Sequence, residues 1–152
     1  MSDISQLETT LVGVSGEYFV AGELSIRGFI ASVTLRNSRG IDIIASNATA
    51  SKTISIQVKT NKSGDPTWIL NKKSETFFAD NHFYVFVALN SPGMRPDFYI
   101  VPSNVVAEHI STFHKQWLSG QKKDGSARKD SSMRVFRDLK RIHKEAWGTL
   151  GL

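Results

Sequence analysis

The chain has 152 residues, of which 40% are apolar and 22% charged, and its formal net charge is +5. These are the values of an ordinary globular chain, so we expect one domain over residues 1–152. The absence of cysteine excludes disulfides and thiolate metal sites, and it suits a cytoplasmic protein. The chain start lacks the pattern of a signal peptide, and every apolar run is too short to span a bilayer, so no membrane association is expected.

Positive charge is concentrated in the last quarter of the chain. From Lys115 onward there are ten Lys and Arg against four Asp and Glu, a formal charge of +6, whereas residues 1–114 have nine against ten. Concentrated positive charge favours a polyanionic partner, usually nucleic acid. A solvated helix followed by a mobile basic loop would produce the same count, so charge alone leaves both interpretations open.

The first predicted element is a helix over residues 4–26, because apolar residues recur there at spacings of three and four. Three glycines lie inside it, at positions 13, 16 and 22. Each costs about 1 kcal/mol relative to alanine, so we expect close packing against another backbone or a ligand. Two β-rich runs at about 29–35 and 41–46 then flank the turn sequence RNSRG and predict a hairpin, and residues 53–60 predict a third strand.

The second half begins with a turn-rich loop at residues 61–68 and an expected short helix at about 73–80. Residues 82–89 contain few polar side chains, which predicts a central strand covered on both faces. A strand at 97–102 follows, and then a helix that begins with Ser103 as its N-cap and runs to about Leu118.

The remaining residues predict a basic, partly disordered loop at about 119–133, a short edge strand at MRVF, and a C-terminal helix over 137–150. Leu139, Ile142 and Ala146 are expected on one side of that helix, with Leu150 as a further candidate. The order of elements predicts an α/β or α+β fold with a central mixed sheet flanked by helices.

Polar residues at three positions depart from this pattern. Glu17 lies beside the apolar side of the first helix, where a carboxylate is costly unless paired or bound to a cation. Asp42 stands between two isoleucines in a predicted strand, where aspartate is disfavoured. Gln57 and Lys59 are two residues apart in the third strand, so both point to the same side.

Each position also has a structural interpretation. Glu17 could be salt-bridged, Asp42 could cap a backbone N–H near the turn, and Gln57 and Lys59 could form the polar side of a half-exposed strand. The two strands are nevertheless expected to pair, which brings Asp42 within reach of Gln57 and Lys59 because paired strands lie about 4.8 Å apart. Carboxylates beside a lysine are the groups that metal-assisted phosphodiester hydrolysis needs.

An acidic helix residue, an aspartate and then [E/Q]-x-K on the next strand resemble the signature of PD-(D/E)XK nucleases, in the segments GEYFVAGEL, GIDIIAS and IQVKT. The helix-first order is most similar to the branch that contains archaeal Holliday-junction resolvases and small bacterial proteins. The resemblance implies a restriction-endonuclease-like fold and a Mg²⁺- or Mn²⁺-dependent endonuclease that acts on DNA in preference to RNA. The catalytic residues it implies are Glu17, Asp42, Gln57 and Lys59. The metal ligands it implies are Glu17, Asp42, Gln57 and the backbone carbonyl of Val58.

The resemblance departs from the usual pattern at Gln57, where glutamate is commoner. Glutamine offers a carbonyl oxygen without charge, which lowers affinity for a hard cation. The alternative function is therefore an inactive nuclease-fold protein that binds nucleic acid or a protein partner. A homodimer would suit cleavage of two strands. The side chains expected to contact phosphates are Lys72, Lys73, Lys122, Lys123, Arg128 and Lys129.

Overall fold

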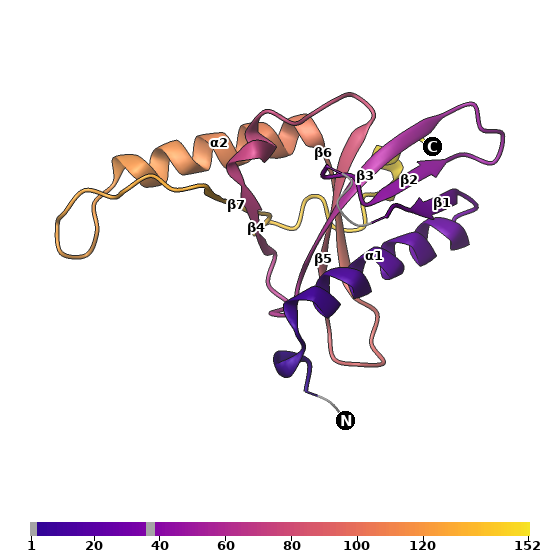
Figure 1. Ribbon diagram of the computed structural model, residues 1–152, viewed down its shortest axis with the longest axis horizontal. Helices are drawn as coiled ribbons and strands as arrows, with labels where there is room; N and C mark the ends of the chain where they lie inside the picture. Colours follow the sequence, from indigo (N-terminus) through magenta and orange to yellow (C-terminus); the bar gives the residue numbers. More distant parts are fainter. Residues whose placement is uncertain (1–2, 36–38) are drawn as a thin grey trace.

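The computed structural model describes residues 3–35 and 39–152 (Figure 1). A 3-10 turn, Ile4–Gln6, precedes helix α1, Thr9–Ile26, and the second helix is α2, Ser103–Ser119. The strands are β1 Ile30–Val33, β2 Ile43–Ser46, β3 Thr53–Asn61, β4 Thr67–Asn71, β5 His82–Ala88, β6 Asp97–Pro102 and β7 Met133–Arg137. Two further 3-10 turns are η2, Lys72–Glu75, and η3, Trp147–Leu150.

The main sheet has the strand order β1-β2-β3-β5-β6. The pair β3–β5 is parallel and the other neighbouring pairs are antiparallel, so the sheet is mixed. Strands β4 and β7 form a separate antiparallel ribbon. The helices α1 and α2 flank the sheet, which confirms the predicted fold class (Figure 1).

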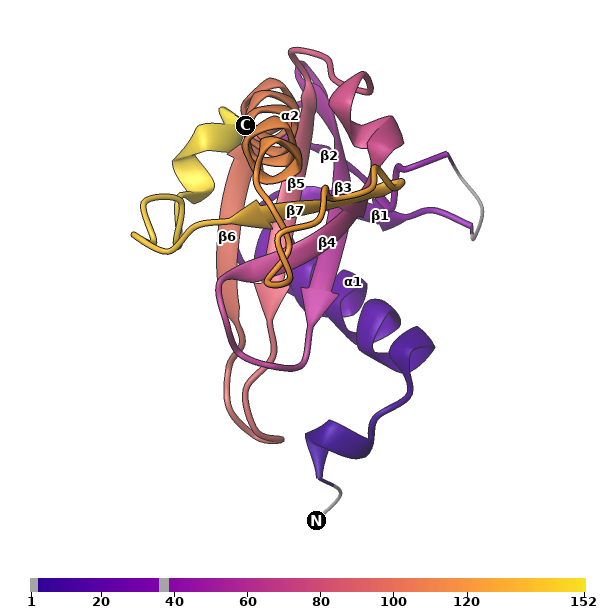
Figure 2. The ribbon, with the colours of Figure 1, turned by 90° about the vertical axis from the view of Figure 1, so that its left-hand side faces the viewer.

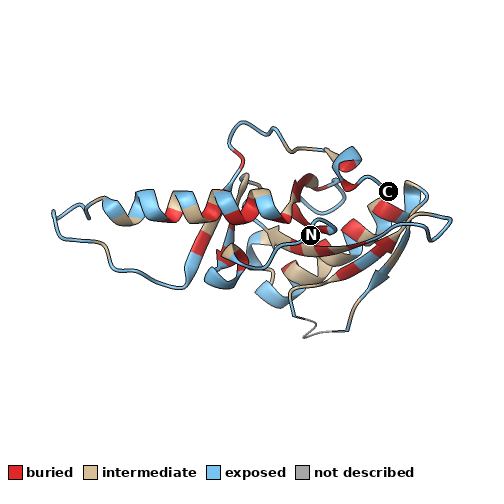
Figure 3. Cartoon of the chain, turned by 90° about the horizontal axis from the view of Figure 1, so that it is seen from above, coloured by how far each residue is buried: buried red, intermediate tan, exposed pale blue. Residues whose placement is uncertain are grey.

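Two apolar clusters lie on opposite faces of the sheet. Alternate residues of β3, such as Ile54 and Ile56, pack with α1 in the first cluster. In the second, aromatic residues of β5 pack against Trp68 of β4, Phe136 of β7 and the inner side of α2. Every residue of β5 is buried, which confirms the expectation of a strand covered on both faces. Burial along α2 extends from Ser103 to His114, and Figure 3 shows that the end of the helix farthest from the sheet has no buried residue.

Several predicted elements differ from the structure. The first helix begins at Thr9 rather than residue 4, after a separate 3-10 turn. A strand, β4, starts inside the expected loop at 61–68, and the expected helix at 73–80 is only the turn Lys72–Glu75. Ser103 is not the N-cap of α2, because Pro102 holds that position, and the Ser103 hydroxyl instead bonds to the backbone of Ala79.

The predicted C-terminal helix at 137–150 is wrong. The buried carboxylate of Asp138 accepts hydrogen bonds from the backbone N–H groups of Ile142 and His143, at 3.1 and 2.8 Å. Arg141 and Glu145 adopt positive φ, which is incompatible with a continuous helix. Only Trp147–Leu150 is helical, and Ile142 is 71% exposed instead of buried.

Candidate active site

Asp42 lies immediately before β2, at the point where this strand stops pairing with β3. Its backbone N–H donates to the carbonyl of Ile56 at 2.8 Å, and its Oδ2 accepts a hydrogen bond from the N–H of Val58 at 2.7 Å. The Asp42 carboxylate thus takes the place of a backbone carbonyl as the acceptor of the next hydrogen bond between β2 and β3. The structural interpretation of Asp42 as a cap on a backbone N–H is therefore correct, and this same bond fixes the carboxylate against β3.

The electrostatics of Asp42 are those of a desolvated carboxylate. Burial raises its pKa above the ordinary value, while the Val58 N–H and the Lys59 ammonium oppose that shift. An aspartate whose charged form is disfavoured by burial gains by contact with a cation. Asp42 thus combines a position fixed by a backbone hydrogen bond with a partly buried charge that the Lys59 ammonium offsets only in part.

Gln57 and Lys59 extend from the face of β3 opposite α1, as the period-two pattern predicts. They line a cleft of about 520 Å³. The other residues around it are Arg39, Gly40, Asn71, Lys73, Ser74 and Phe77. Of the described residues, none that lines this cleft is acidic, so the cleft is cationic and suited to a polyanion.

The far wall of the cleft comes from η2 and the end of β4. Figure 2 shows this turn standing beside the β2–β3 part of the sheet. An ion pair between Glu75 and the buried Arg134 of β7 holds η2 in place, and Asn71 caps it by accepting a hydrogen bond from the Lys73 N–H. Lys73 therefore reaches the cleft, as expected of a phosphate contact, whereas Lys72 is exposed and does not line it.

The Val58 carbonyl lies on the same side of β3 as Asp42. Ser55 N–H bonds to Asn81 O and Asn61 O accepts from Leu89 N–H, so odd-numbered residues of β3 direct their backbone groups toward β5. Backbone groups of even-numbered residues point the opposite way. The N–H and carbonyl of Val58 therefore both face the edge where Asp42 lies.

Glu17 is half-buried on α1, which packs on the other face of the sheet from Gln57 and Lys59. Gly16, the residue before Glu17, lies very close to β3, because a Cβ added to Gly16 would lie 1.8 Å from Thr60 Oγ1. Glu17 is thus placed where α1 crosses the C-terminal half of β3. The structure brings Asp42, Gln57 and Lys59 together. That Glu17 belongs to the same site stays a prediction.

Two buried polar residues beside the cleft were not singled out as site residues by the sequence. Tyr84 pairs with Gln57 in the β3–β5 register and is fully buried. Burial raises the pKa of Tyr84; Ser74 opposes this and the Asp42 charge adds to it, which places both groups nearby. His82, two residues earlier, bonds through Nδ1 to Ser55 Oγ at 2.8 Å, and burial lowers its pKa.

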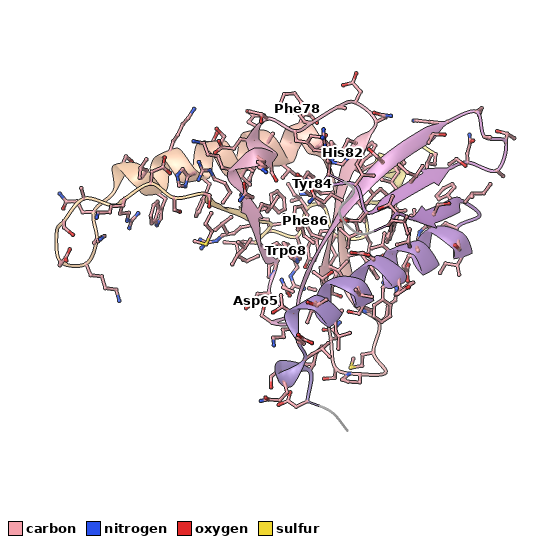
Figure 4. All side chains as sticks on the ribbon, in the orientation of Figure 1. Asp65, Trp68, Phe78, His82, Tyr84 and Phe86 are labelled. Atoms are coloured by element: carbon pink, nitrogen blue, oxygen red, sulfur yellow. The ribbon has the colours of Figure 1, made fainter. Side chains whose placement is uncertain are left out.

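Figure 4 shows His82, Tyr84 and Phe86 in a row along β5. The parallel pairing of β3 with β5 puts these three residues on the sheet face that carries Gln57 and Lys59. Knowledge of that pairing would have identified them as neighbours of the site. Their alternation with valine and phenylalanine in an apolar run conceals that face in the sequence.

The other side chains predicted to contact phosphates do not line the cleft. Lys122, Lys123 and Lys129 are exposed in the loop that joins α2 to β7 at the tip of a projecting arm (Figure 1). Arg128 lies over the Trp117 ring at 5.0 Å and donates to the Trp117 carbonyl at 2.6 Å. The loop contains a turn in which the Lys122 N–H donates to Ser126 O at 2.9 Å, and its partial disorder stays a prediction.

The oxygen donors around Asp42 fit a hard cation. Within residues 3–35 and 39–152, no three His, Asp or Glu side chains are grouped as metal ligands. Mg²⁺ needs fewer, because it is commonly held by one or two carboxylates and keeps several waters. The Asp42 carboxylate, the Gln57 amide oxygen and the Val58 carbonyl are an all-oxygen donor set of that type.

Comparison with known proteins finds a similarity of fold alone. No protein-family model matches the sequence, and a search of curated proteins finds no match. The fold is similar to that of a bacterial homing endonuclease, I-Ssp6803I, with a TM-score of 0.54 and 14% identity over 95% of this chain and 92% of that chain. No helix among the described residues is long and apolar enough to cross a membrane.

Proposed function

We propose that this protein is a metal-dependent endonuclease that hydrolyses phosphodiester bonds in DNA and uses the arrangement of the PD-(D/E)XK nucleases. The observation that carries the proposal is the half-buried Asp42 carboxylate, fixed by the Val58 N–H and within electrostatic reach of Lys59, which lines a cationic cleft. A partly desolvated carboxylate is costly unless a cation balances it. Carboxylates with such perturbed pKa values at a cleft are candidates for functional sites. The nuclease-like fold supports the same conclusion.

Each residue has a separate role in this proposal. Asp42, Gln57 and the Val58 carbonyl would hold Mg²⁺ or Mn²⁺, and Glu17 would supply a further carboxylate. A bound ion would polarise the phosphoryl oxygen and lower the pKa of a bound water. Lys59 places its ammonium beside the attacked phosphate, where it stabilises the negative charge that develops during attack.

Arg39 and Lys73 lie around Lys59 in the cleft and neutralise neighbouring phosphates of the DNA backbone. Their role is positioning, because phosphate contacts fix the register of the duplex without reading its sequence. In this proposal the cleft, which no acidic residue lines, binds the DNA backbone. Hydrolysis takes place beside Asp42.

The test replaces the carboxylate and retains its hydrogen bond. Asp42→Asn keeps an oxygen that accepts from the Val58 N–H, so the fold should survive while Mg²⁺-dependent nicking of supercoiled DNA is lost and DNA binding persists. Asp65→Asn, at an exposed aspartate in the loop before β4, is the matched control and should retain full activity. Wild-type nicking rates in purified Asp42→Asn protein would refute the assignment.

The alternative is an inactive nuclease-fold protein that binds nucleic acid or a partner, and the uncharged Gln57 favours it. Gln57→Glu adds a negative charge at nearly constant volume, so an active site should bind Mn²⁺ or Mg²⁺ more tightly and cleave at least as fast. Calorimetric titration measures this, with Gln116→Glu on the exposed side of α2 as the control. Unchanged metal affinity in Gln57→Glu would favour the inactive protein.

A further inference from the structure

The β4–β7 ribbon has an outer side that the described chain covers only in part, where α2 borders β7. Its inner residues, Trp68, Leu70, Arg134 and Phe136, are buried against the body of the protein. The outer residues form three cross-strand pairs, Asn71 with Met133, Ile69 with Val135, and Thr67 with Arg137. The ribbon is thus a narrow two-stranded element with one free face.

Apolar groups on that free face are unusually exposed. Ile69 is 65% and Met133 51% exposed, although both lie in regular strands. Phe113 and Trp117 of α2 border a hollow of about 170 Å³ beside Met133 and Val135, and the Arg137 guanidinium lies over the Phe113 ring at 4.8 Å. No acidic residue is found among the described residues that line this hollow.

The free face also joins the two cationic regions of the molecule. At one end, Asn71 belongs both to the ribbon and to the lining of the candidate active site, next to Lys73. Met133, which pairs with Asn71 at the same end of the ribbon, follows directly on the arm that carries Lys122, Lys123, Arg128 and Lys129 (Figure 2). A duplex bound through its phosphates at both regions would pass over this end of the ribbon, so charge complementarity selects DNA as the occupant.

We propose that the outer face of the β4–β7 ribbon enters the major groove of duplex DNA and determines which sequence is cut; this inference rests on the proposed endonuclease function. The major groove is about 12 Å wide and admits a two-stranded ribbon. The chemistry of the face matches base edges. Apolar Ile69 and Met133 suit the thymine methyl group, and the Arg137 guanidinium suits guanine.

The register of the ribbon sets the distance between the reading residues and the cut. Residues two apart on a strand are separated by about 6.8 Å, so the pair Thr67–Arg137 lies about 14 Å from Asn71 at the cleft. Base pairs rise by about 3.4 Å. The bases that the ribbon reads therefore lie within about four base pairs of the cleaved phosphate, on one side of it.

The experiment uses the full chain with Asp42→Asn, which binds DNA without cutting it. A pool of randomised duplexes is selected for binding, and the preferred duplex is then remade with single base analogues. Uracil for thymine and 7-deazaguanine for guanine change only the major groove, whereas inosine for guanine removes the amino group from the minor groove. We expect the first two to weaken binding by about 5-fold to 100-fold near the cut, and inosine to have less than about a 2-fold effect.

Two sets of variants assign the effect to the ribbon. Ile69→Thr and Met133→Thr keep exposed strand residues and should change the selected sequence while leaving the salt dependence of binding unaltered. Lys122→Gln with Lys123→Gln is the matched control, which should weaken binding to every sequence and flatten the salt dependence. A selection with no sequence preference, sensitivity to inosine alone, or ribbon variants with the wild-type preference would overturn the inference.

The outcomes separate this inference from the proposed function. Metal-dependent nicking with a preference that the ribbon variants leave intact refutes the ribbon and retains the endonuclease. A ribbon-dependent preference without nicking in the wild-type protein retains the ribbon and refutes the catalytic assignment. Absence of DNA binding by Asp42→Asn refutes both, and a protein partner would then be the occupant of the free face.

Discussion

Replacing Gly16 by alanine tests how closely α1 approaches β3. An added Cβ would lie 1.8 Å from Thr60 Oγ1, 2.9 Å from its Cβ and 3.1 Å from its Cγ2. Rotation of Thr60 about χ1 can move Oγ1 and Cγ2 but leaves the Thr60 Cβ at 2.9 Å, so the helix itself must move. Overpacking of this kind costs about 1–3 kcal/mol, and we expect Gly16→Ala to destabilise the protein by about 2 kcal/mol, or roughly 4–8 °C in Tm.

Gly22→Ala in the same helix is the matched control. Nothing lies within 4 Å of a Cβ built there, so alanine should stabilise by about 0.5–1 kcal/mol through helix propensity alone. Urea denaturation of both variants measures the difference, which should be about 3 kcal/mol between two identical substitutions. Equal stabilisation by the two alanines would refute the close contact and the placement of Glu17 that depends on it.

The remaining predictions concern charge. Burial raises the pKa of Asp42, so its ionised form opposes folding. Asp42→Asn should therefore raise Tm near neutral pH, and this gain should vanish once the pH falls below the usual aspartate range. Thermal denaturation at both pH values measures the gain, and a gain that persists in acid would contradict the reasoning. Neutralising the arm should flatten the plot of log K against log salt by about 0.9 per lost phosphate contact, and an unchanged slope would show that these side chains are only solvated. The four arm positions to change to glutamine are Lys122, Lys123, Arg128 and Lys129. As proposed above, Asp42→Asn should also abolish nicking and Gln57→Glu should tighten metal binding.

The failures of prediction have physical causes that belong to particular residues. The C-terminal segment shows helical spacing, but the buried Asp138 carboxylate captures two backbone N–H groups and holds a turn instead. Similarly, β4 is a strand because its residues pair with β7, more than sixty positions later in the chain. Local periodicity contains no information about such distant partners, so tertiary contacts override it.

The walls of the candidate site show the same limit. Asn71, Lys73, Ser74 and Phe77 line the cleft with Gln57 and Lys59, and pairing with β7, through the β4–β7 ladder and the Glu75–Arg134 ion pair, holds their segment in place. Tyr84 joins them through the parallel register of β3 and β5. None of these relations can be obtained from spacing along one strand.

The sequence by itself determined the mixed sheet, the buried strand β5, and the side of β3 on which Gln57 and Lys59 lie. These follow from period-two alternation, because a strand that buries one set of residues must direct the other set away from it. Only the tertiary structure decided that Asp42 bonds to Val58, that a cationic cleft opens at this place, and that the β4–β7 ribbon has a free face. Those features arise from pairing between segments that are distant in the chain, and their energies depend on burial that exists only after folding.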